Sequence, residues 1–129
     1  EKDKLIDELK ITEGQEPYRN SRDKKYLAVY EGQPYMLDEF GGIPWMAATD
    51  RNNSWGYGGM PKDEEAFYQR LEGQIDALIA SKHVCGFCYT QLTDVEQEKN
   101  GVYYYDRRPK LDMKRIKAIF EKIPSRPAK

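Results

Sequence analysis

Residues 35–45 read Tyr35-Met36-Leu37-Asp38-Glu39-Phe40-Gly41-Gly42-Ile43-Pro44-Trp45, and they set the interpretation of the whole chain. Residues 35–38 are expected to form a short buried strand, opened by Pro34, whose missing N–H matters least at a strand start. This strand delivers an acidic residue, Glu39, to a turn marked by Gly41 and Gly42. Chemistry in α/β proteins sits at the C-terminal ends of strands, where loops build a cleft. A carboxylate there, followed by glycines and tryptophans, indicates a sugar site.

Two later segments show helical periodicity with a defined start. Asp63 and Asp112 are expected N-caps, and apolar residues recur at helical spacing over 63–81 and 112–122. Between these helices, residues 84–89 are almost continuously apolar, which predicts a second strand buried on both faces. The order strand, helix, strand, helix predicts βα units with parallel strands and both helices on one face.

The other segments are a short helix and several connections. Apolar residues on one face predict a helix over 3–10. Glycine and proline interrupt 12–33, and glycine and asparagine argue against regular structure over 43–61. A short extended piece is expected at 102–105. After it we expect a solvated basic turn formed by Arg107, Arg108 and Lys110.

The composition excludes several classes of function. A net charge of −1 and a pI near 5.9 give no basic field for nucleic acid. No apolar run approaches the ~20 residues of a membrane span, and no signal peptide is visible. Hydrophobic residues make up only 39% of the chain, and the first residues open in mid-helix, so we expect a fragment of a larger protein. The compartment stays open between bacterial cytoplasm and periplasm.

Ten Tyr and two Trp carry most of the aromatic content, which suits surfaces that bind polar rings. Trp45, Trp55 and Tyr57 lie in a polar loop. One interpretation is that they anchor the loop by burying their rings. The other is a stacking platform for the apolar face of a sugar. The two interpretations can hold for different rings.

Cys85 and Cys88 form a C-x-x-C pair. A zinc site needs a second pair, and His83 alone does not complete four ligands. A redox motif places the second cysteine in a helix, whereas this segment is predicted to be a strand. We therefore expect two buried free thiols, and the sequence indicates neither a metal nor a cofactor.

Glu39 is the leading candidate for chemistry, although a strand-end carboxylate bound to backbone N–H groups is the plainer interpretation. A retaining glycosidase needs two carboxyl groups ~5–5.5 Å apart across the scissile bond. Asp38 cannot be the partner on a regular strand, because adjacent residues point to opposite sides. Asp94 and Glu96, just past the second strand, are candidates, with metal or hydrogen-bond roles equally open. Asp94 is expected to organise its loop.

Two motifs resemble one enzyme family. Residues 35–42, Tyr35-Met36-Leu37-Asp38-Glu39-Phe40-Gly41-Gly42, resemble the nucleophile strand of family 2 glycoside hydrolases, the β-galactosidase and β-glucuronidase group. Residues 85–101, Cys85-Gly86-Phe87-Cys88-Tyr89-Thr90-Gln91-Leu92-Thr93-Asp94-Val95-Glu96-Gln97-Glu98-Lys99-Asn100-Gly101, resemble the last barrel strand and following loop of a bacterial branch. Residues 106–110 are similar to the family's closing segment. The likeness runs from about Pro34 to Phe120.

The resemblance implies a (β/α)₈ TIM barrel, of which residues 1–129 form a C-terminal fragment with the last two βα units. It implies a retaining β-glycosidase with Glu39 as nucleophile. The acid/base glutamate of this family follows an asparagine on an earlier strand. This sequence has no Asn-Glu pair, so that glutamate is expected outside the fragment. The implied partners are a carbohydrate substrate, the remainder of the barrel and the N-terminal β domains.

We expect six residues to contact the sugar: Trp45, Trp55, Tyr57, Thr90, Gln91 and Asp94. Thr90 stands where the family commonly has a tryptophan on the last strand, so the floor of the sugar site must differ. Glu98-Lys99-Asn100 stands where glucuronidases have Asn-x-Lys to hold the sugar carboxylate. A glutamate there would repel a uronate, which favours a neutral sugar such as a β-galactoside.

Two other classes of function stay open. The runner-up is a noncatalytic carbohydrate-binding domain in which Trp45, Trp55 and Tyr57 hold the sugar. The third is a structural or interaction domain in which Glu39 has no consequence. A binding domain should fold and bind saccharide alone, whereas a barrel fragment should do neither well. Exposed strand edges and apolar surface promote association, so we expect dimers or larger species.

Overall fold

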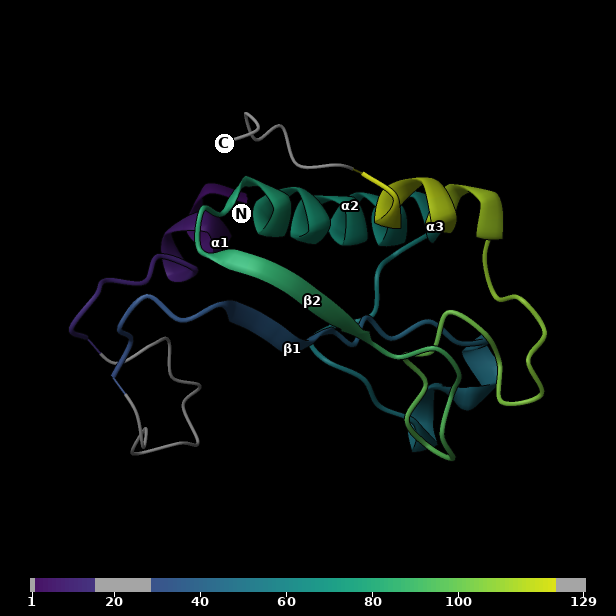
Figure 1. The fold of residues 1–129 in the computed structure, drawn as a ribbon. Helices are drawn as coiled ribbons and strands as arrows, with labels where there is room; N and C mark the ends of the chain where they lie inside the picture. Colours follow the sequence, from purple (N-terminus) through teal and green to yellow (C-terminus); the bar gives the residue numbers. More distant parts are fainter. Residues whose placement is uncertain (1, 16–28, 123–129) are drawn as a thin grey trace.

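Two parallel strands and three α-helices organise the part of the chain that this computed structural model describes, residues 2–15 and 29–122 (Figure 1). The elements follow in the order α1 (Lys2–Glu8), β1 (Tyr35–Gly41), the 3₁₀ helix η1 (Ala48–Asn53), α2 (Glu64–Ala80), β2 (Val84–Thr90) and α3 (Met113–Phe120). The described residues therefore form a small mixed α/β domain. The predicted helices and both predicted strands are confirmed, with bounds that differ slightly. The expected burial of the first strand is wrong, because no residue of β1 is fully buried and Met36 is 55% exposed.

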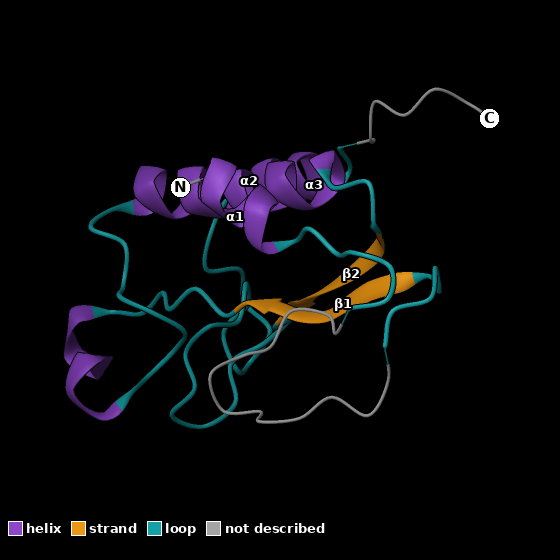
Figure 2. Cartoon of the chain, turned by 90° about the vertical axis from the view of Figure 1, so that its left-hand side faces the viewer, coloured by secondary structure: helices purple, strands orange, loops and turns teal. Residues whose placement is uncertain are grey.

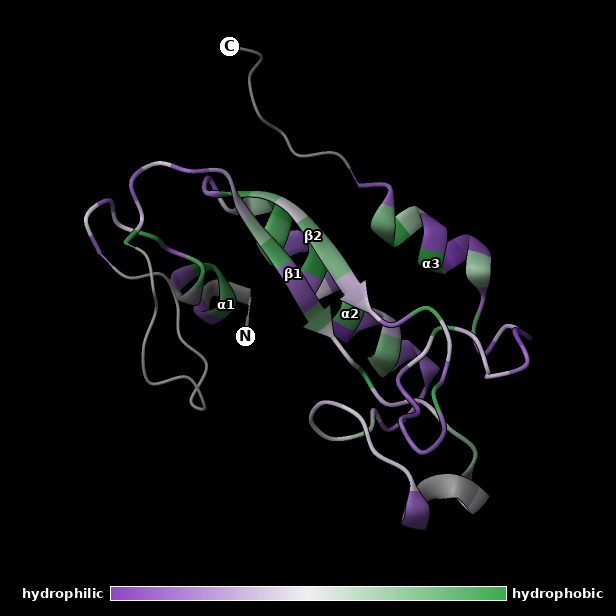
Figure 3. Ribbon diagram, turned by 60° about the horizontal axis from the view of Figure 1, so that its bottom comes forward, coloured by the Kyte–Doolittle hydropathy of each residue, from purple (hydrophilic) through white to green (hydrophobic). Residues whose placement is uncertain are grey.

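β1 and β2 pair in parallel, which confirms the predicted βα order. Tyr35 lies opposite Val84, and at the other end Gly41 lies opposite Thr90. α2 provides the crossover that a parallel connection needs, and the helices lie on one face of the sheet (Figure 2). No described helix or strand covers the opposite face, which is turned toward the viewer in Figure 3.

The hydrophobic core lies between the sheet and the helices and extends into the loops at the sheet end. α2 begins at Asp63, whose Oδ1 accepts a hydrogen bond from the Ala66 N–H at 2.7 Å. Asp112 caps α3 in the same way, with the Lys114 N–H at 2.9 Å. The buried core residues are Ile43, Phe67, Tyr68, Leu71, Ile75, Val102, Leu111, Ile116 and Ile119. None of the described helices combines the length and apolar character that a bilayer span requires.

The predicted burial of β2 is wrong. Val84 is the only fully buried residue of this strand, and Cys85 and Cys88 are exposed free thiols rather than buried ones. The physical reason is the single helical layer: a continuous apolar run predicts cover on both faces, but described helices cover one face only. Both cysteines therefore lie at the solvent-exposed surface of β2.

Two predictions of local structure also need correction. Ala48–Asn53 forms η1 within the segment predicted to be irregular, because a short 3₁₀ helix needs only local i→i+3 bonds. Residues 102–105 do not form a strand. Tyr103 alone makes isolated bridges there, to Thr93 and to Pro109. Of the connection 12–33, residues 16–28 lie outside the described part.

Candidate active site at the ends of the strands

An irregularity in β1 sets the direction of Glu39. Leu37 and Phe40 are three residues apart, but their partners on β2 are only two apart, so Asp38 and Glu39 together face one residue. Leu37 and Phe40 both line the apolar hollow between β1, α1 and α2. Regular alternation would have put Glu39, not Phe40, on the face of Leu37. The bulge exchanges these places and leaves Glu39 exposed to solvent. The alternation argument that separated Asp38 from Glu39 is therefore wrong for this strand.

Two glycines allow aromatic rings to approach the end of β1. Gly41 and Gly42 have φ angles of +93° and +57°, in the region that side chains rarely adopt. A Cβ on Gly41 would overlap the ring of Tyr89, and a Cβ on Gly42 would overlap the ring of Tyr57. The glycine pair is thus required both by the backbone turn and by the close approach of two rings.

Tyr57 binds Glu39 directly. Its hydroxyl donates a hydrogen bond to Oε1 of Glu39. The backbone of Tyr57 is fixed on both sides, since its N–H donates to the Gly42 carbonyl at 2.7 Å and its carbonyl accepts from Arg70 at 2.9 Å. Trp55 stacks on Tyr57 with ring centroids 6.2 Å apart and planes 29° apart. Trp55 is 52% exposed and Tyr57 is 39% exposed, so both rings remain open to a ligand.

Trp45 has a different environment from the other two rings. Its ring packs edge-on against Phe67 of the core, with centroids 6.0 Å apart. The backbone N–H of Trp45 donates to the Lys99 carbonyl at 2.9 Å. Of the two interpretations of the loop aromatics, anchoring by burial fits Trp45, and an exposed platform fits Trp55 and Tyr57. The predicted sugar contacts of all three stay predictions.

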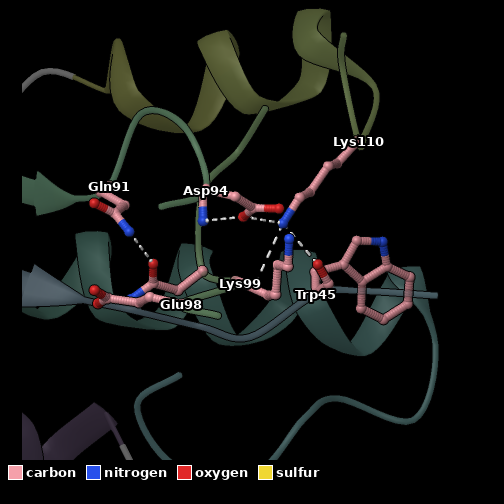
Figure 4. Close-up of polar contacts among 8 residues, drawn as sticks. Trp45, Gln91, Asp94, Glu98, Lys99 and Lys110 are labelled. Atoms are coloured by element: carbon pink, nitrogen blue, oxygen red, sulfur yellow. Dashed lines mark hydrogen bonds and ion pairs between the residues drawn. The ribbon is translucent and has the colours of Figure 1, made fainter. Parts of the chain in front are cut away.

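A buried ion pair lies in the segment between β2 and α3, and its lysine also contacts the loop after β1 (Figure 4). Asp94 Oδ1 and Lys110 Nζ lie 2.5 Å apart, with side chains 1% and 0% exposed. Lys110 also donates to the carbonyls of Trp45 at 2.7 Å and Lys99 at 3.3 Å. Asp94 Oδ1 accepts the Gly101 N–H at 3.0 Å. The carboxylate of Asp94 is therefore engaged inside its loop, and the expectation of a solvated Lys110 is wrong.

A second polar chain follows the end of β2. Gln91 Nε2 donates to Asn100 Oδ1 at 2.7 Å, and Asn100 Nδ2 donates to Glu98 Oε1 at 2.9 Å (Figure 4). Asn100 is fully buried, so both ends of its amide are used to fix the other two side chains. The backbone of Glu98 forms an isolated β-bridge with that of Trp55. Thr90, at the strand end, accepts the Gly42 N–H through its carbonyl at 2.7 Å.

The sequence analysis identified Glu39 and Asp94 as candidate residues but did not identify the side chains that bind them. Lys110 was predicted as part of a solvated turn because Arg107 and Arg108 stand beside it, and no local signal distinguishes it from them. The bond from Tyr57 to Glu39 spans 18 positions in the sequence. The described residues contain no group of three or more His, Cys, Asp or Glu that could hold a metal ion.

The arrangement supplies one exposed carboxylate with a fixed hydrogen-bond donor and an adjacent pair of aromatic rings. A carboxylate held in this way can act as a nucleophile or accept a hydroxyl of a ligand. No model of a known protein family matches the chain, and no curated protein is similar enough in sequence to count as a relative.

Proposed function

We propose that this chain is part of a retaining β-glycosidase, with Glu39 as its nucleophile. The observation that carries the proposal is the bulge in β1, which exposes Glu39 at the C-terminal half of a parallel strand under the hydroxyl of Tyr57. β-Bulges are frequent beside active sites because they re-aim a side chain. The loops that follow both strands, which carry these polar and aromatic residues, lie at the same end of the sheet (Figure 1), where α/β enzymes build their clefts.

The barrel origin of the domain is part of the same proposal: a C-terminal part of a (β/α)₈ barrel, with its last two βα units. α2 packs on the sheet formed by the strands before and after it. A helix that connects two parallel strands packs on the sheet that they form. α3 should therefore cover β2 and a further parallel strand that follows α3 in the sequence. An open hollow of about 500 Å³ lies between the end of β2 and α3. Its apolar walls, including Tyr89, Ile116 and Phe120, fit the place of such a strand.

The proposed reaction proceeds through two displacements. The Glu39 carboxylate attacks the anomeric carbon while the bond to the leaving oxygen breaks, and an acid protonates that oxygen. Water then attacks the anomeric carbon and releases Glu39 from the glycosyl ester. Asp94 is engaged with Lys110 and Gly101, which supports an acid/base glutamate supplied from outside this chain. The carbohydrate is a neutral sugar such as a β-galactoside, since Glu98 would repel a uronate.

Replacement of Glu39 tests the proposal. In the intact protein, Glu39→Gln keeps the side-chain shape and removes the attacking charge, so kcat should fall by several orders of magnitude while KM changes little. A fluorinated galactoside with a good leaving group should trap the ester, and peptide mass mapping should find the label on the peptide with Glu39. A label on Asp38 or Asp94, or none in residues 1–129, would refute the assignment. The isolated chain should be inactive on aryl β-galactoside and β-glucuronide, because the second carboxyl group is missing.

Tyr57→Phe provides a finer test of the same site. The change removes the donor to Glu39 but keeps the ring that stacks on Trp55. A hydrogen bond to a charged group contributes about 1.5–3 kcal/mol when desolvated, and less at this exposed position, so we expect kcat to fall roughly tenfold. Loss of folding, followed by circular dichroism, would instead show that the hydroxyl is structural.

A noncatalytic carbohydrate-binding domain is the second candidate, favoured by the exposed stack of Trp55 on Tyr57. In that case the isolated chain should bind saccharide, and Glu39→Gln should leave the affinity within about twofold. Trp45 should not contribute directly, since its ring faces the core residue Phe67.

A further inference from the structure

A third hollow lies in the loop between β1 and α2, apart from the pair formed by Tyr57 and Glu39. Its volume is about 420 Å³, within the range of small-ligand sites. Tyr57 does not line it, and Trp55 is the residue that belongs to both the hollow and the aromatic stack. The walls are formed by Pro44, Met46, Ser54, Trp55, Gly56, Gly58, Met60, Pro61 and Lys62.

The hollow is held open by bonds from other elements. Arg70 of α2 donates to the Gly59 carbonyl at 2.7 Å as well as to Tyr57. The N–H of Trp55 donates to the Gln97 carbonyl at 2.9 Å, and its carbonyl accepts the Lys99 N–H at 2.8 Å. A Cβ on Gly56 would come within 2.7 Å of Pro44, so the two sides of the loop meet closely at its base. A hollow fixed in advance costs a ligand little ordering free energy.

The chemistry of the walls selects a polar ring. Trp55 offers a half-exposed indole on a fixed backbone, which suits a ligand with one apolar face. Ser54, Lys62 and the backbone of the glycines offer hydrogen-bond groups around it. Lys62 is a poor anion site, because its ammonium group is exposed and lies 3.8 Å from the carboxylate of Asp63. A neutral pyranose ring uses both kinds of wall, whereas an alkyl group uses only one.

We infer that this hollow binds a second pyranose ring of the substrate, so that the substrate is an oligosaccharide rather than a simple glycoside. The inference rests on the proposed function, because it takes the ring beside Glu39 as the one that is cleaved. The stack of Trp55 on Tyr57, and the bond from Tyr57 to Glu39, connect the two places through adjacent side chains. A chain of β-linked sugars with one ring at Glu39 continues past Tyr57 to Trp55.

Substrate length is the test, carried out on the intact protein. The measured quantity is kcat/KM for an aryl β-galactoside and for a β-linked galactotriose. Trp55→Ala should lower kcat/KM about tenfold further for the trisaccharide than for the aryl galactoside, a difference of ~1.4 kcal/mol. Ser54→Phe, which adds bulk to a wall of the hollow, should show the same preference, and it keeps the test valid where Trp55→Ala fails to fold. Gly73→Ala on α2 is the control, since Gly73 does not line the hollow and its Cβ would meet no atom within 4 Å.

Equal loss on both substrates, or no loss on either, would overturn the inference. A binding measurement separates it from the proposed function. In the Glu39→Gln protein, galactotriose should perturb the backbone NMR signals of Ser54, Gly56 and Met60, and Trp55→Ala should abolish this. Binding without any Glu39-dependent hydrolysis would reject the glycosidase and the substrate role of the hollow. Hydrolysis without binding there would reject the hollow alone.

Discussion

Lys110 has an environment very different from that of its neighbours in the sequence. It stands two positions from Arg108, whose side chain is 74% exposed, yet its own ammonium group is fully buried. Isolated buried charges are very unfavourable, so Lys110 depends on Asp94 and on the carbonyls of Trp45 and Lys99. The contact with Trp45 spans 65 positions, so this one side chain fixes two loops relative to each other.

Lys110→Met should therefore be strongly destabilising. Removal of one partner leaves the Asp94 carboxylate buried without its counter-charge, which costs about 3–5 kcal/mol. Chemical denaturation followed by tryptophan fluorescence measures this loss. The double change Asp94→Asn with Lys110→Met should recover part of it, because the amide oxygen still accepts the Gly101 N–H. Arg108→Met, in the same turn but exposed, should stay within about 0.5 kcal/mol. Equal losses for Lys110→Met and Arg108→Met would contradict the burial.

Among the elements, β1 depends on its bulge for the position of Glu39. Removal of Asp38 would leave Leu37, Glu39 and Phe40 in regular alternation, with Leu37 and Phe40 still facing α2. We expect this deletion to change the free energy of unfolding by about 1 kcal/mol or less. Deletion of Leu37, an apolar wall residue of the hollow under α2, should cost about 2–5 kcal/mol. Thermal unfolding compares the two, and similar losses would mean that the bulge itself stabilises the strand.

Helices α2 and α3 are joined by ion pairs on their exposed sides. Arg115 binds the Glu65 carboxylate through both terminal nitrogens of its guanidinium group, at 2.6 and 2.9 Å. This hydrogen bonding lowers the pKa of Glu65 below its ordinary 4.5. Burial acts to lower the pKa of Lys122, but its bonds to Asp76 and Glu72 outweigh burial and raise that pKa above 10.5. The Glu65 contribution is thus present above pH 4.5 and lost as the pH falls through the lowered value. The Lys122 contribution is present below 10.5 and lost as the pH rises through the raised value.

A comparison with Arg115→Met across pH tests this assignment. The variant should melt at a lower temperature than the parent near neutral pH, because it lacks the bond to Glu65. The two should converge as the pH falls through the lowered pKa of Glu65 and this carboxylate takes up its proton. Lys117→Met serves as the control, since its partner Glu121, the C-cap residue of α3, lies 3.5 Å away and both are exposed. A difference in melting temperature that persists at acidic pH would assign the role of Arg115 to its stacking on the Tyr68 ring, 4.1 Å away.

On the scale of the whole molecule, the sequence predicts what repeats locally and misses what joins distant segments. Helix caps at Asp63 and Asp112 and the apolar stripes of α2 and α3 were predictable because each signal lies within one element. The same holds for Glu39 as an acid near a glycine pair, but its exposure follows from the bulge. The bulge was not predictable, since it follows from the register against β2. Nor were the Asp94–Lys110 pair and the Gln91–Asn100–Glu98 chain, whose partners meet only after folding.

The uncovered face of the sheet also governs how the chain behaves in solution. Met36 is 55% exposed on β1, Leu92 68% exposed after β2, and the hollow between β2 and α3 has apolar walls. Among the described elements β2 has a single strand neighbour, β1, so its other edge is open to pairing. These are the surfaces at which a further strand of the proposed barrel would pack. In the isolated chain a second copy is the available partner for them.

We therefore expect the isolated 129-residue chain to form dimers or larger species. Sedimentation velocity over a range of concentrations, with a reducing agent present, measures the association without disulfides between the exposed Cys85 and Cys88 thiols. Cys85→Lys places a charge on β2 and should weaken association, because charged side chains oppose edge pairing. Lys114→Met is the matched control and should leave association unchanged, because Lys114 is an exposed charge on α3 that does not line the hollow between β2 and α3. A clean monomer at high concentration would oppose the barrel-fragment proposal, because an incomplete barrel leaves strand edges unpaired, and it would favour the carbohydrate-binding domain.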